Sequence, residues 1–248
     1  MENTGYIALS RQTALWRRMD TIANNLANMN TSGFRGQDMM FTDYLVRTPN
    51  TDSAFRDQVR FVQDIGQVND LTPGPQKSTG NAMDLALQGD DTFFAVEAFG
   101  GEKYTRSGGF TLDDQGKLVT RDGSTVLSDA GTPIFIAPNE SRFNVSESGT
   151  VSTENGVIAK LKVVRFDNPQ ALRRVGSTLW EANTDQTAQP APEARVAQGL
   201  LEGSNINGVV EMTRMIDVQR SYQQTQNIID REDERIRKTI DIWTRRSV

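Results

Sequence analysis

The chain opens with a regular row of apolar residues between positions 3 and 30. Successive members are three or four residues apart, with Gln12 as the single interruption: Ala8, Leu15, Met19, Ile22, Leu26 and Met29. This spacing puts one apolar seam on one face of a helix. The helix should end between residues 30 and 33, because Gly33 tolerates the left-handed conformation that closes helices.

A second helix is predicted between residues 204 and 243. Serine and asparagine residues that can cap it come first, and Glu211 lies in its first turns. Every seventh residue is then apolar: Met215, Tyr222, Ile229, Ile236 and Trp243. The companion positions are poorer, since Val218 is followed by polar residues at 225, 232 and 239. This heptad stripe is too polar to be a self-sufficient coiled coil.

Residues 80–186 show the pattern of β-strands, with short apolar runs separated by turn signals. Asp122-Gly123 and Asn155-Gly156 are strong signals for tight hairpins, and residues 113–116 suit a longer turn. No helical period lies between the runs, so we expect an antiparallel sheet. The pattern leaves the strand order open.

Two connectors separate these regions. Residues 36–79 mix charged residues with Pro-containing stretches, and we expect them to be extended, with room for a short helix or strand. Residues 187–203 hold Pro190 and Pro192 among small polar residues, which is typical of a linker.

The sequence therefore predicts an α+β protein. Its N- and C-terminal helices are expected to pack as a coiled-coil-like terminal domain, and its central domain to be mainly antiparallel β. The expected segments are a helix in 1–35, a connector in 36–79, the β domain in 80–186, a linker in 187–203 and a helix in 204–248.

Composition narrows the chemistry. The 248 residues include no cysteine and no histidine, which removes thiolate chemistry, the commonest general base and the commonest metal ligand. Carboxylate catalysis remains open, but most hydrolytic, metal-dependent and redox mechanisms are disfavoured, and we expect no cofactor and no metal.

The net charge of −5 does not favour a nucleic-acid partner. No apolar run approaches about 18 residues, so we expect no membrane insertion, and Glu2 sits where a cleavable signal would be basic and then apolar.

Uncharged polar side chains line both predicted helices beside their apolar seams. The N-terminal set is Asn24, Asn28 and Thr31, and the C-terminal set is Gln219, Gln223 and Gln226. Amides suit hydrogen bonding to a neighbouring chain, although an ordinary polar helix surface would look the same. An amphipathic helix without a partner leaves an apolar stripe in water, so the two ends should pair within one subunit, between subunits, or both.

Four blocks of the chain resemble a known family. ANNLANMNTSGFR (23–35) and LEGSNINGVVEMTRMIDVQRSYQQTQNII (201–229) are similar to the N- and C-terminal signatures of flagellar basal-body rod, hook and hook-associated proteins. TGNAMDLALQGDDTFFAV (79–96) and YTRSGGFTLDDQGKLVTRDGSTVL (104–127) resemble the β segments that rod and hook proteins share. Ala82 and Met83 stand where relatives often have Pro and Leu. The opening TGYIALSRQTALWRRMD is most similar to the proximal-rod members, and the distal-rod paralogue is the alternative within the family.

This resemblance implies a structural subunit and not an enzyme. Such proteins leave the cell through the flagellar type III export apparatus without a cleaved signal and assemble in the periplasm. Their partners are other copies and the neighbouring proximal-rod and distal-rod subunits. Their terminal helices line a tube that transmits torque and passes later subunits, and their β domain packs outside.

The expected assembly interface lies in the two helices and in the segment after the first. Its residues are Leu15, Met19, Ile22, Asn24, Asn25, Leu26, Asn28, Met29, Thr31, Gly33, Phe34, Met215, Gln219, Tyr222, Gln223, Gln226, Ile229, Ile236 and Trp243.

Two other classes remain as alternatives. A secreted carbohydrate-active enzyme would use paired carboxylates such as Asp113 and Asp122, which must lie a few ångströms apart across a cleft. Both residues look like turn residues. A coiled-coil adaptor would bind one partner helix without polymerising, and would form a defined small oligomer.

Overall fold

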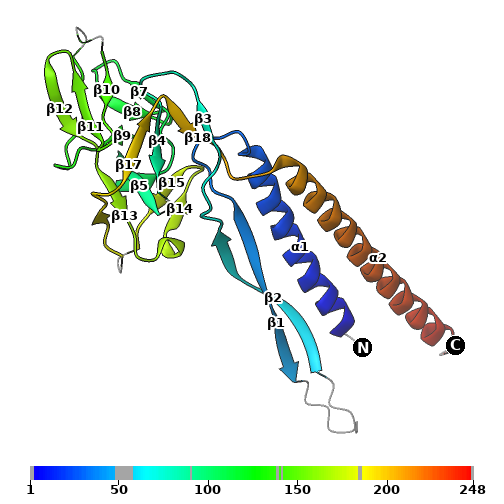
Figure 1. Ribbon diagram of the computed structural model, residues 1–248. Helices are drawn as coiled ribbons and strands as arrows, with labels where there is room; N and C mark the ends of the chain where they lie inside the picture. The colour runs from blue at the N-terminus through cyan, green and yellow to red at the C-terminus, as the bar shows by residue number, and fades with distance from the viewer. Residues whose placement is uncertain are drawn as a thin grey trace. The chain divides into compact units, whose positions relative to one another are not determined.

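The chain folds as an α+β protein with a helix near each end and a mainly antiparallel β region between them (Figure 1). The computed structural model describes residues 3–47, 58–89, 91–137, 140, 142–183 and 186–246. These residues form two compact units. The helical unit comprises residues 1–27, 37–68 and 207–248, and the β unit comprises residues 28–36 and 69–206.

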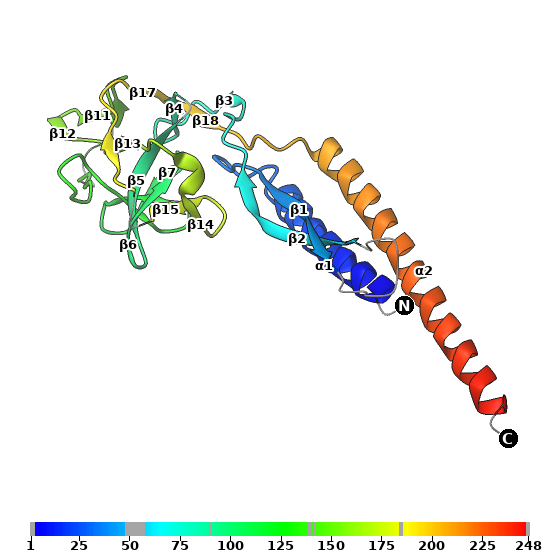
Figure 2. The same ribbon diagram turned by 90° about the horizontal axis from the view of Figure 1, so that it is seen from below.

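The helical unit contains two helices and two strands. Helix α1 (Asn3–Ala27) and helix α2 (Gly208–Arg246) lie side by side and run antiparallel (Figures 1 and 2). Strands β1 (Gln37–Arg47) and β2 (Gln58–Asn69) pair in a two-stranded sheet, and α1 also contacts β1. The segment expected to be an extended connector therefore forms paired strands.

The two helices have defined ends. Asn207 caps α2, because its side-chain oxygen accepts a hydrogen bond from the backbone N–H of Val209 (3.0 Å). Helix α1 ends at Ala27, a few residues before the expected stop, because the carbonyl of Asn28 accepts a turn hydrogen bond from Thr31 N (3.1 Å). The hydroxyl of Thr31 also donates to the Asn28 side chain (3.1 Å), so both residues stabilise the turn.

The β unit is built from short strands. Their bounds are β3 (Gln76–Ser78), β4 (Leu85–Gln88), β5 (Thr92–Ala98), β6 (Gly101–Thr105), β7 (Phe110–Leu112), β8 (Leu118–Thr120), β9 (Thr125–Val126), β10 (Asn144–Val145), β11 (Thr150–Thr153), β12 (Gly156–Lys160), β13 (Val163–Arg165), β14 (Arg173–Val175), β15 (Leu179–Glu181), β16 (Gln189–Pro190), β17 (Arg195–Gln198) and β18 (Leu200–Glu202), with a 3-10 turn at Pro169–Ala171.

The largest sheet has the order β14-β15-β6-β5-β9-β8-β7, and β13 joins it by pairing with both β5 and β16. Strands β10, β11 and β12 form a second sheet, and two further pairs are β17 with β4 and β18 with β3. These pairings in the β unit are antiparallel, as the sequence predicted.

Strand β5 lies at the centre of the core because it is buried on both faces. Successive side chains of a strand point to opposite sides of the sheet. Phe94 and Val96 therefore join one apolar cluster with Phe110, while Phe93 and Ala95 join another that contains Trp180. The two clusters together hold the strands of the main sheet.

The predicted hairpin turns are confirmed. Gly123, between β8 and β9, has φ +82° and donates its N–H to Thr120 O (2.9 Å). Gly156, at the start of β12, has φ +131° and pairs with Thr153. These φ values favour glycine, so the local sequence sets the position of both turns.

The expected linker at 187–203 differs from the structure. This stretch forms β16, β17 and β18, which return to pair with β13, β4 and β3. Val196 is buried in the main apolar cluster, and Pro190 sits in a two-residue pairing where a missing N–H costs little. Pro190 and Pro192 favoured the linker interpretation, and the short strands here are recognised only through their pairing with strands that are distant in the sequence.

Candidate assembly interface

The expected apolar seam of α1 lies against α2 of the same chain. Gln12 donates a side-chain hydrogen bond to Gln226, which fixes the face that α1 turns toward α2. Residues three or four apart share that face. Ile22 on it is buried, while Leu15, Met19 and Leu26 are partly buried.

The matching seam of α2 is centred on the companion row, not on the heptad stripe. Val218 and Thr225 are only 4% and 2% exposed. Met215, Tyr222 and Ile229 are partly buried beside them. Thr225 fits there because its hydroxyl donates to Ser221 O of the preceding turn (2.9 Å), which satisfies the polar group.

Farther along α2 the same seam is open. Ile236 and Ile240 are half exposed. Trp243 belongs to α2, but its side chain lies outside the described residues. Helix α2 has 39 residues against 25 in α1, so the antiparallel partner is too short to cover the whole stripe.

The expected amide residues have different roles. Asn25 is buried and holds β1, because its amide donates to Gln37 O (2.9 Å) and accepts from Gln37 N (3.1 Å). Gln226 donates to Asp230 (3.0 Å). Asn24, Gln219 and Gln223 are exposed on the helix surfaces.

Gly33 and Phe34 belong to the β unit and are buried there. Gly33 has φ +69°, and a Cβ at this position would lie 2.3 Å from the backbone nitrogen of Ser107. The Phe34 ring lies 4.5 Å from the guanidinium of Arg174, which also lies 4.7 Å from the Trp180 ring. Both residues are packed inside the β unit, so they leave no surface for a neighbouring subunit.

A buried ion triad, which sequence reasoning missed, fixes the same segment. Glu202 on β18 lies between Arg35 (2.6 Å) and Arg106 (2.7 Å), and all three side chains are buried. Glu202 also accepts from Gly74 N (3.3 Å). Arg35 ends the block GFR, Arg106 ends YTR and Glu202 lies in LEGSN, and each is the single charged residue of its block. A lone charge among neutral residues was the signal in the sequence that could have indicated this buried cluster.

Arg174 strengthens this attachment, since it also donates a hydrogen bond to Arg35 O. Burial lowers the pKa of Arg174 to about 10, so the side chain is still charged at neutral pH.

Hydrogen bonds connect three segments of the β unit. Along the sequence, these segments lie next to residues of the helical unit. Gly36 N donates to the Asn205 side chain (2.8 Å), and Asp70 N donates to Gly36 O (2.8 Å). The Asn205 amide closes the set by donating to Asp70 O (3.0 Å). We call residues 33–36, 70–74 and 202–205 the three-segment junction.

The helices also expose apolar stripes that sequence reasoning missed. Tyr6, Leu9 and Trp16 follow helical spacing on α1 and are 62%, 54% and 61% exposed. On α2, Val209, Met212 and Ile216 do the same. The three-to-four spacing was visible in the sequence, offset from the seams that the analysis selected. Such contiguous exposed stripes mark interaction surfaces.

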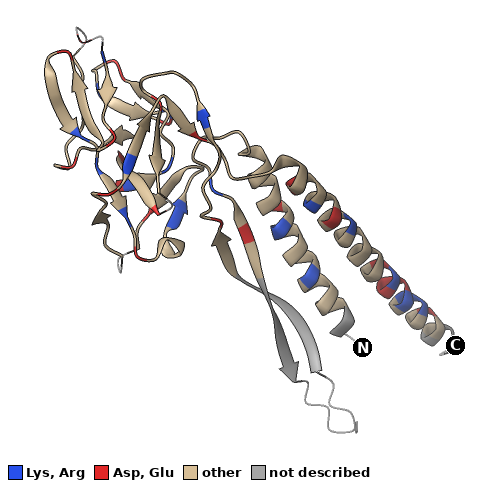
Figure 3. Cartoon of the chain, in the orientation of Figure 1, with Lys and Arg blue, Asp and Glu red and all other residues tan. Residues whose placement is uncertain are grey.

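Charges cover the remaining surface of the C-terminal half of α2, where acidic and basic residues alternate (Figure 3). Lys238 pairs with Glu234 (2.7 Å), and Arg237 pairs with Asp233 (2.9 Å). The hydrogen bond from Lys238 lowers the pKa of Glu234. This is a solvated helix face.

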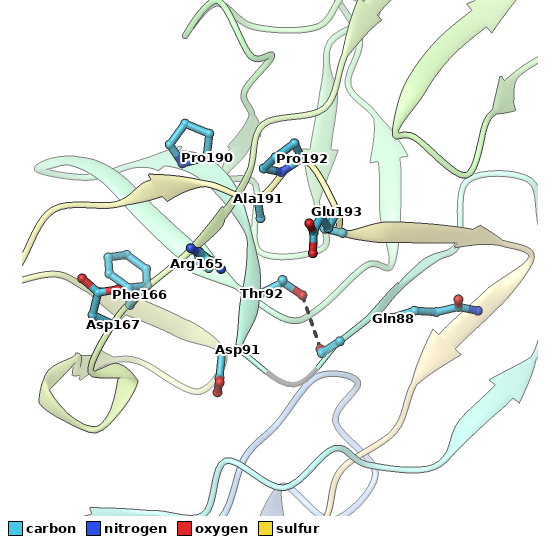
Figure 4. Close-up of a pocket in the computed structure, with 12 residues that line it drawn as sticks. Gln88, Asp91, Thr92, Arg165, Phe166, Asp167, Pro190, Ala191, Pro192 and Glu193 are labelled. Atoms are coloured by element: carbon cyan, nitrogen blue, oxygen red, sulfur yellow. Dashed lines mark hydrogen bonds between the residues drawn. The ribbon is translucent and has the colours of Figure 1, made fainter.

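A hollow of about 720 Å³ lies beside β13 and the turn before β17 (Figure 4). Arg165, Asp91, Asp167 and Glu193 contribute charges to it, and the carboxylates point in different directions in this view. Gln189 donates to Asp167 (2.8 Å). The groups do not converge as a pair of catalytic carboxylates would.

The carboxylates of the enzyme alternative serve turns. Asp113 accepts hydrogen bonds from the backbone N–H groups of Gln115 (2.9 Å) and Lys117 (2.7 Å), and Asp122 accepts from Thr178 (3.4 Å). Within the described residues, no cluster of three metal-ligating side chains occurs and no helix is long and apolar enough to cross a membrane.

Paired terminal helices with exposed apolar stripes, in a chain that also has a separate compact β unit, are typical of a structural protein that assembles with neighbouring chains. Three family models match the chain: "Flagella basal body rod protein" at 6–35, "Flagellar hook protein FlgE/F/G D1 domain" at 86–153 and "Flagellar basal body rod FlgEFG protein C-terminal" at 197–242.

Whole-chain relatives agree with these matches. The "Flagellar basal-body rod protein FlgF" of Caulobacter vibrioides is 37% identical over 97% of this chain and 98% of its own length. The FlgF of Mesorhizobium japonicum is 33% identical over 91% of both chains, and the FlgG of Bacillus subtilis is 31% identical over 96% of this chain and 97% of its own. The chain belongs to the flagellar basal-body rod protein family, and it is a structural subunit, not an enzyme.

Proposed function

We propose that this chain occupies the proximal part of the flagellar rod, in the place that FlgF holds in its relatives, and that it polymerises through its terminal helices. Three of the relatives that match over nine-tenths or more of the chain are named FlgF. In this proposal the helices pack as a coiled-coil-like tube wall that transmits torque and leaves a channel for exported subunits. The chain itself is exported by the flagellar type III apparatus without a cleaved signal and assembles in the periplasm.

The observation that supports assembly most directly is that α1 already packs on two sides within the chain and still exposes apolar side chains on a third. One side contacts α2 and a second contacts β1. The third side carries Tyr6, Leu9 and Trp16, each more than half exposed. A contiguous exposed apolar stripe of this kind is typical of an interaction surface, so the third side suits a neighbouring subunit.

The energies favour assembly through a lattice of several neighbours. Burying one large apolar side chain contributes about 1.5–3 kcal/mol. Ordering a free chain end costs roughly 1–2 kcal/mol per residue for the backbone alone. A few buried side chains therefore cannot order a long helix alone, whereas contacts on several faces can.

Helix α2 supplies a stripe of complementary character. Val209, Met212 and Ile216 are exposed, and the same spacing continues through Gln219 and Gln223. An apolar start followed by uncharged amides suits a neighbour that buries the first part and accepts hydrogen bonds from the second. This places the expected amides on the surface proposed for neighbours, together with the open seam at Ile236 and Ile240. Its partners are further copies and the adjoining rod subunits.

The test is to replace Trp16 by aspartate in a motile strain that has this chain as its only copy. We expect loss of incorporation into purified hook–basal bodies and loss of swimming, while the melting temperature of the purified chain is unchanged. Arg18→Asp, on another side of the same helix, is the matched control and should incorporate. Normal rods containing the Trp16→Asp chain would refute assembly through this face.

The distal rod is the second candidate, because the relatives named FlgG also match nearly the whole chain. Cryo-electron microscopy of hook–basal bodies separates the two positions. Side chains of this protein in the proximal layers would support the first position, and side chains only in the distal layers would support the second.

A further inference from the structure

The turn between β5 and β6 presents a phenylalanine that is completely outside the protein. Phe99 is 103% exposed, and no other large apolar side chain among the described residues is as exposed. It stands at the corner of a two-residue turn closed by Ala98 and Gly101. Gly100 follows it with φ +90°, which glycine adopts without strain.

The hairpin below Phe99 is held rigidly. Lys103 is buried and pairs with Glu181, and Tyr104 packs in the second apolar cluster. An aromatic side chain on a rigid support loses little conformational entropy when it binds, which is typical of an interface anchor.

The hairpin also carries two carboxylates at positions where their repulsion destabilises the strand pairing. Glu97 and Glu102 face each other across the two strands. Like charges directly opposite in a sheet destabilise it. Lys162 pairs with Glu102 (2.8 Å), and Glu97 is exposed at the foot of the turn. The tip therefore combines an apolar knob with a negative charge.

Another part of the β unit has the complementary shape and charge. A pocket of about 240 Å³ has Lys77 as the charged residue among those that line it. Its apolar lining comes from Met29, Pro75, Leu201 and Ile206, and its uncharged polar lining from Asn30, Ser32, Thr79 and Ser204. A cavity of roughly 150 Å³ accepts a benzene ring, so one phenyl group fits here.

We propose that Phe99 of one copy inserts into this pocket of a second copy, with Glu97 beside Lys77 of that copy. The same copy cannot satisfy both sites, since the β5–β6 turn lies well away from β3 and β18 within the β unit (Figure 2). A contact between different patches of identical chains is head-to-tail and propagates into a ring or a helical array. This contact is additional to the helical surfaces of the proposed function and uses none of them.

The natural absence of cysteine makes crosslinking the sharpest test, because introduced thiols are the only ones in the chain. Glu97→Cys and Lys77→Cys are combined in one chain that supports swimming, and isolated basal bodies are treated with a short bismaleimide. We expect a ladder of covalent multimers of this chain. Co-expressing the two single variants should give dimers and no higher species.

Two controls define the specificity. Glu97→Cys with Lys160→Cys, which places the second thiol on exposed β12, should give no ladder. Adding Phe99→Ala to the first pair should lower the crosslinked fraction about tenfold, since truncating an anchor costs more than 1 kcal/mol. It should leave the melting temperature unchanged, because the ring touches nothing in the free chain.

The outcomes separate this contact from the proposed function. Basal bodies that contain the cysteine pair without any ladder would overturn the contact and leave the rod assignment intact. Absence of the unmodified chain from basal bodies would overturn both. If the cysteine variants fail to incorporate, an exchange of the two charges tests the contact instead. Glu97→Lys alone should impair swimming, and adding Lys77→Glu in the double variant should restore it. Failure to restore swimming would overturn the contact.

Discussion

Glu202 lies buried between two arginines that come from distant parts of the chain, at 2.6 Å from Arg35 and 2.7 Å from Arg106. Replacing it by glutamine would leave two buried guanidinium groups without a counter-charge. We expect Glu202→Gln to lower the free energy of unfolding of the β unit by about 3–5 kcal/mol, measured by urea denaturation.

A second carboxylate is the matched control for that prediction. Glu181 also lies between two cations, Lys103 and Arg173, whose hydrogen bonds lower its pKa. It is more exposed than Glu202, so water can replace the lost partner. An equal loss from Glu181→Gln would contradict the importance of burial in the triad.

Gly33 and Gly123 allow backbone strain to be separated from steric overlap. Both have φ near +70 to +80°, yet a Cβ at Gly33 meets the Ser107 backbone at 2.3 Å and a Cβ at Gly123 meets nothing within 4 Å. Alanine at either site should cost about 1–2 kcal/mol from the left-handed conformation. Gly33→Ala should cost clearly more in the same denaturation experiment, and equal effects would mean that residues 28–36 move freely.

Tyr104 predicts how the fold responds to alkali. Burial, followed by the nearby charge of Glu102, raises its pKa to about 12 from an ordinary value of 10. The neutral phenol is favoured in the folded state, so its contribution to stability is complete below pH 10 and is lost as the pH rises toward 12. Melting temperatures measured from pH 9 to 12 should fall less steeply for Tyr104→Phe, and an unchanged slope would remove Tyr104 as the cause.

At the scale of elements, α2 divides into a part that α1 covers and a part that it leaves open. Val218 is buried against α1, whereas Ile236 is half exposed. Val218→Ala should lower the melting temperature of the helices in the isolated chain, followed by circular dichroism, because a buried side chain is lost. Ile236→Ala should leave that transition unchanged and weaken incorporation into basal bodies, and a shared effect on melting would contradict this division.

Much of the element pattern was predictable because its causes are local. Helical periodicity gave both helices, and the Asp-Gly and Asn-Gly pairs gave two hairpins. Strands of two to four residues such as β16 and β17 carry too few positions to show a period, and their pairing depends on β13 and β4 far away in sequence. Long-range pairing is the part that local patterns do not contain.

The sequence predicts which helices carry apolar faces but not which face the chain covers by itself. Periodicity identifies an apolar face, yet it does not say whether the chain itself covers that face. Leu15 and Ile22 lie on the face that α1 turns toward α2, whereas Trp16 stays exposed, and Thr225 is more buried than Met215. Phe34 was expected at an interface and instead packs inside the β unit, because a pairing with Arg174 cannot be read from spacing.

For the whole molecule, the compact β unit is larger than the predicted β domain. It takes in residues 28–36 and extends from 69 to 206, whereas the sequence suggested 80–186. Limited proteolysis of the purified chain, analysed by mass spectrometry, should therefore protect a fragment of residues 69–206. It should retain a peptide containing residues 28–36 after cleavage, and a protected fragment confined to 80–186 would contradict this.

The three-segment junction has a mechanical consequence. Residues 33–36, 70–74 and 202–205 are cross-bonded through Gly36, Asp70 and Asn205, and the Glu202 triad adds ionic links at the same place. A twisting load that reaches the β unit along any one of these segments is shared by the other two and strains their bonds together in shear. Peeling one segment away would also break its bonds to the other two, so the three segments should yield together and not one at a time.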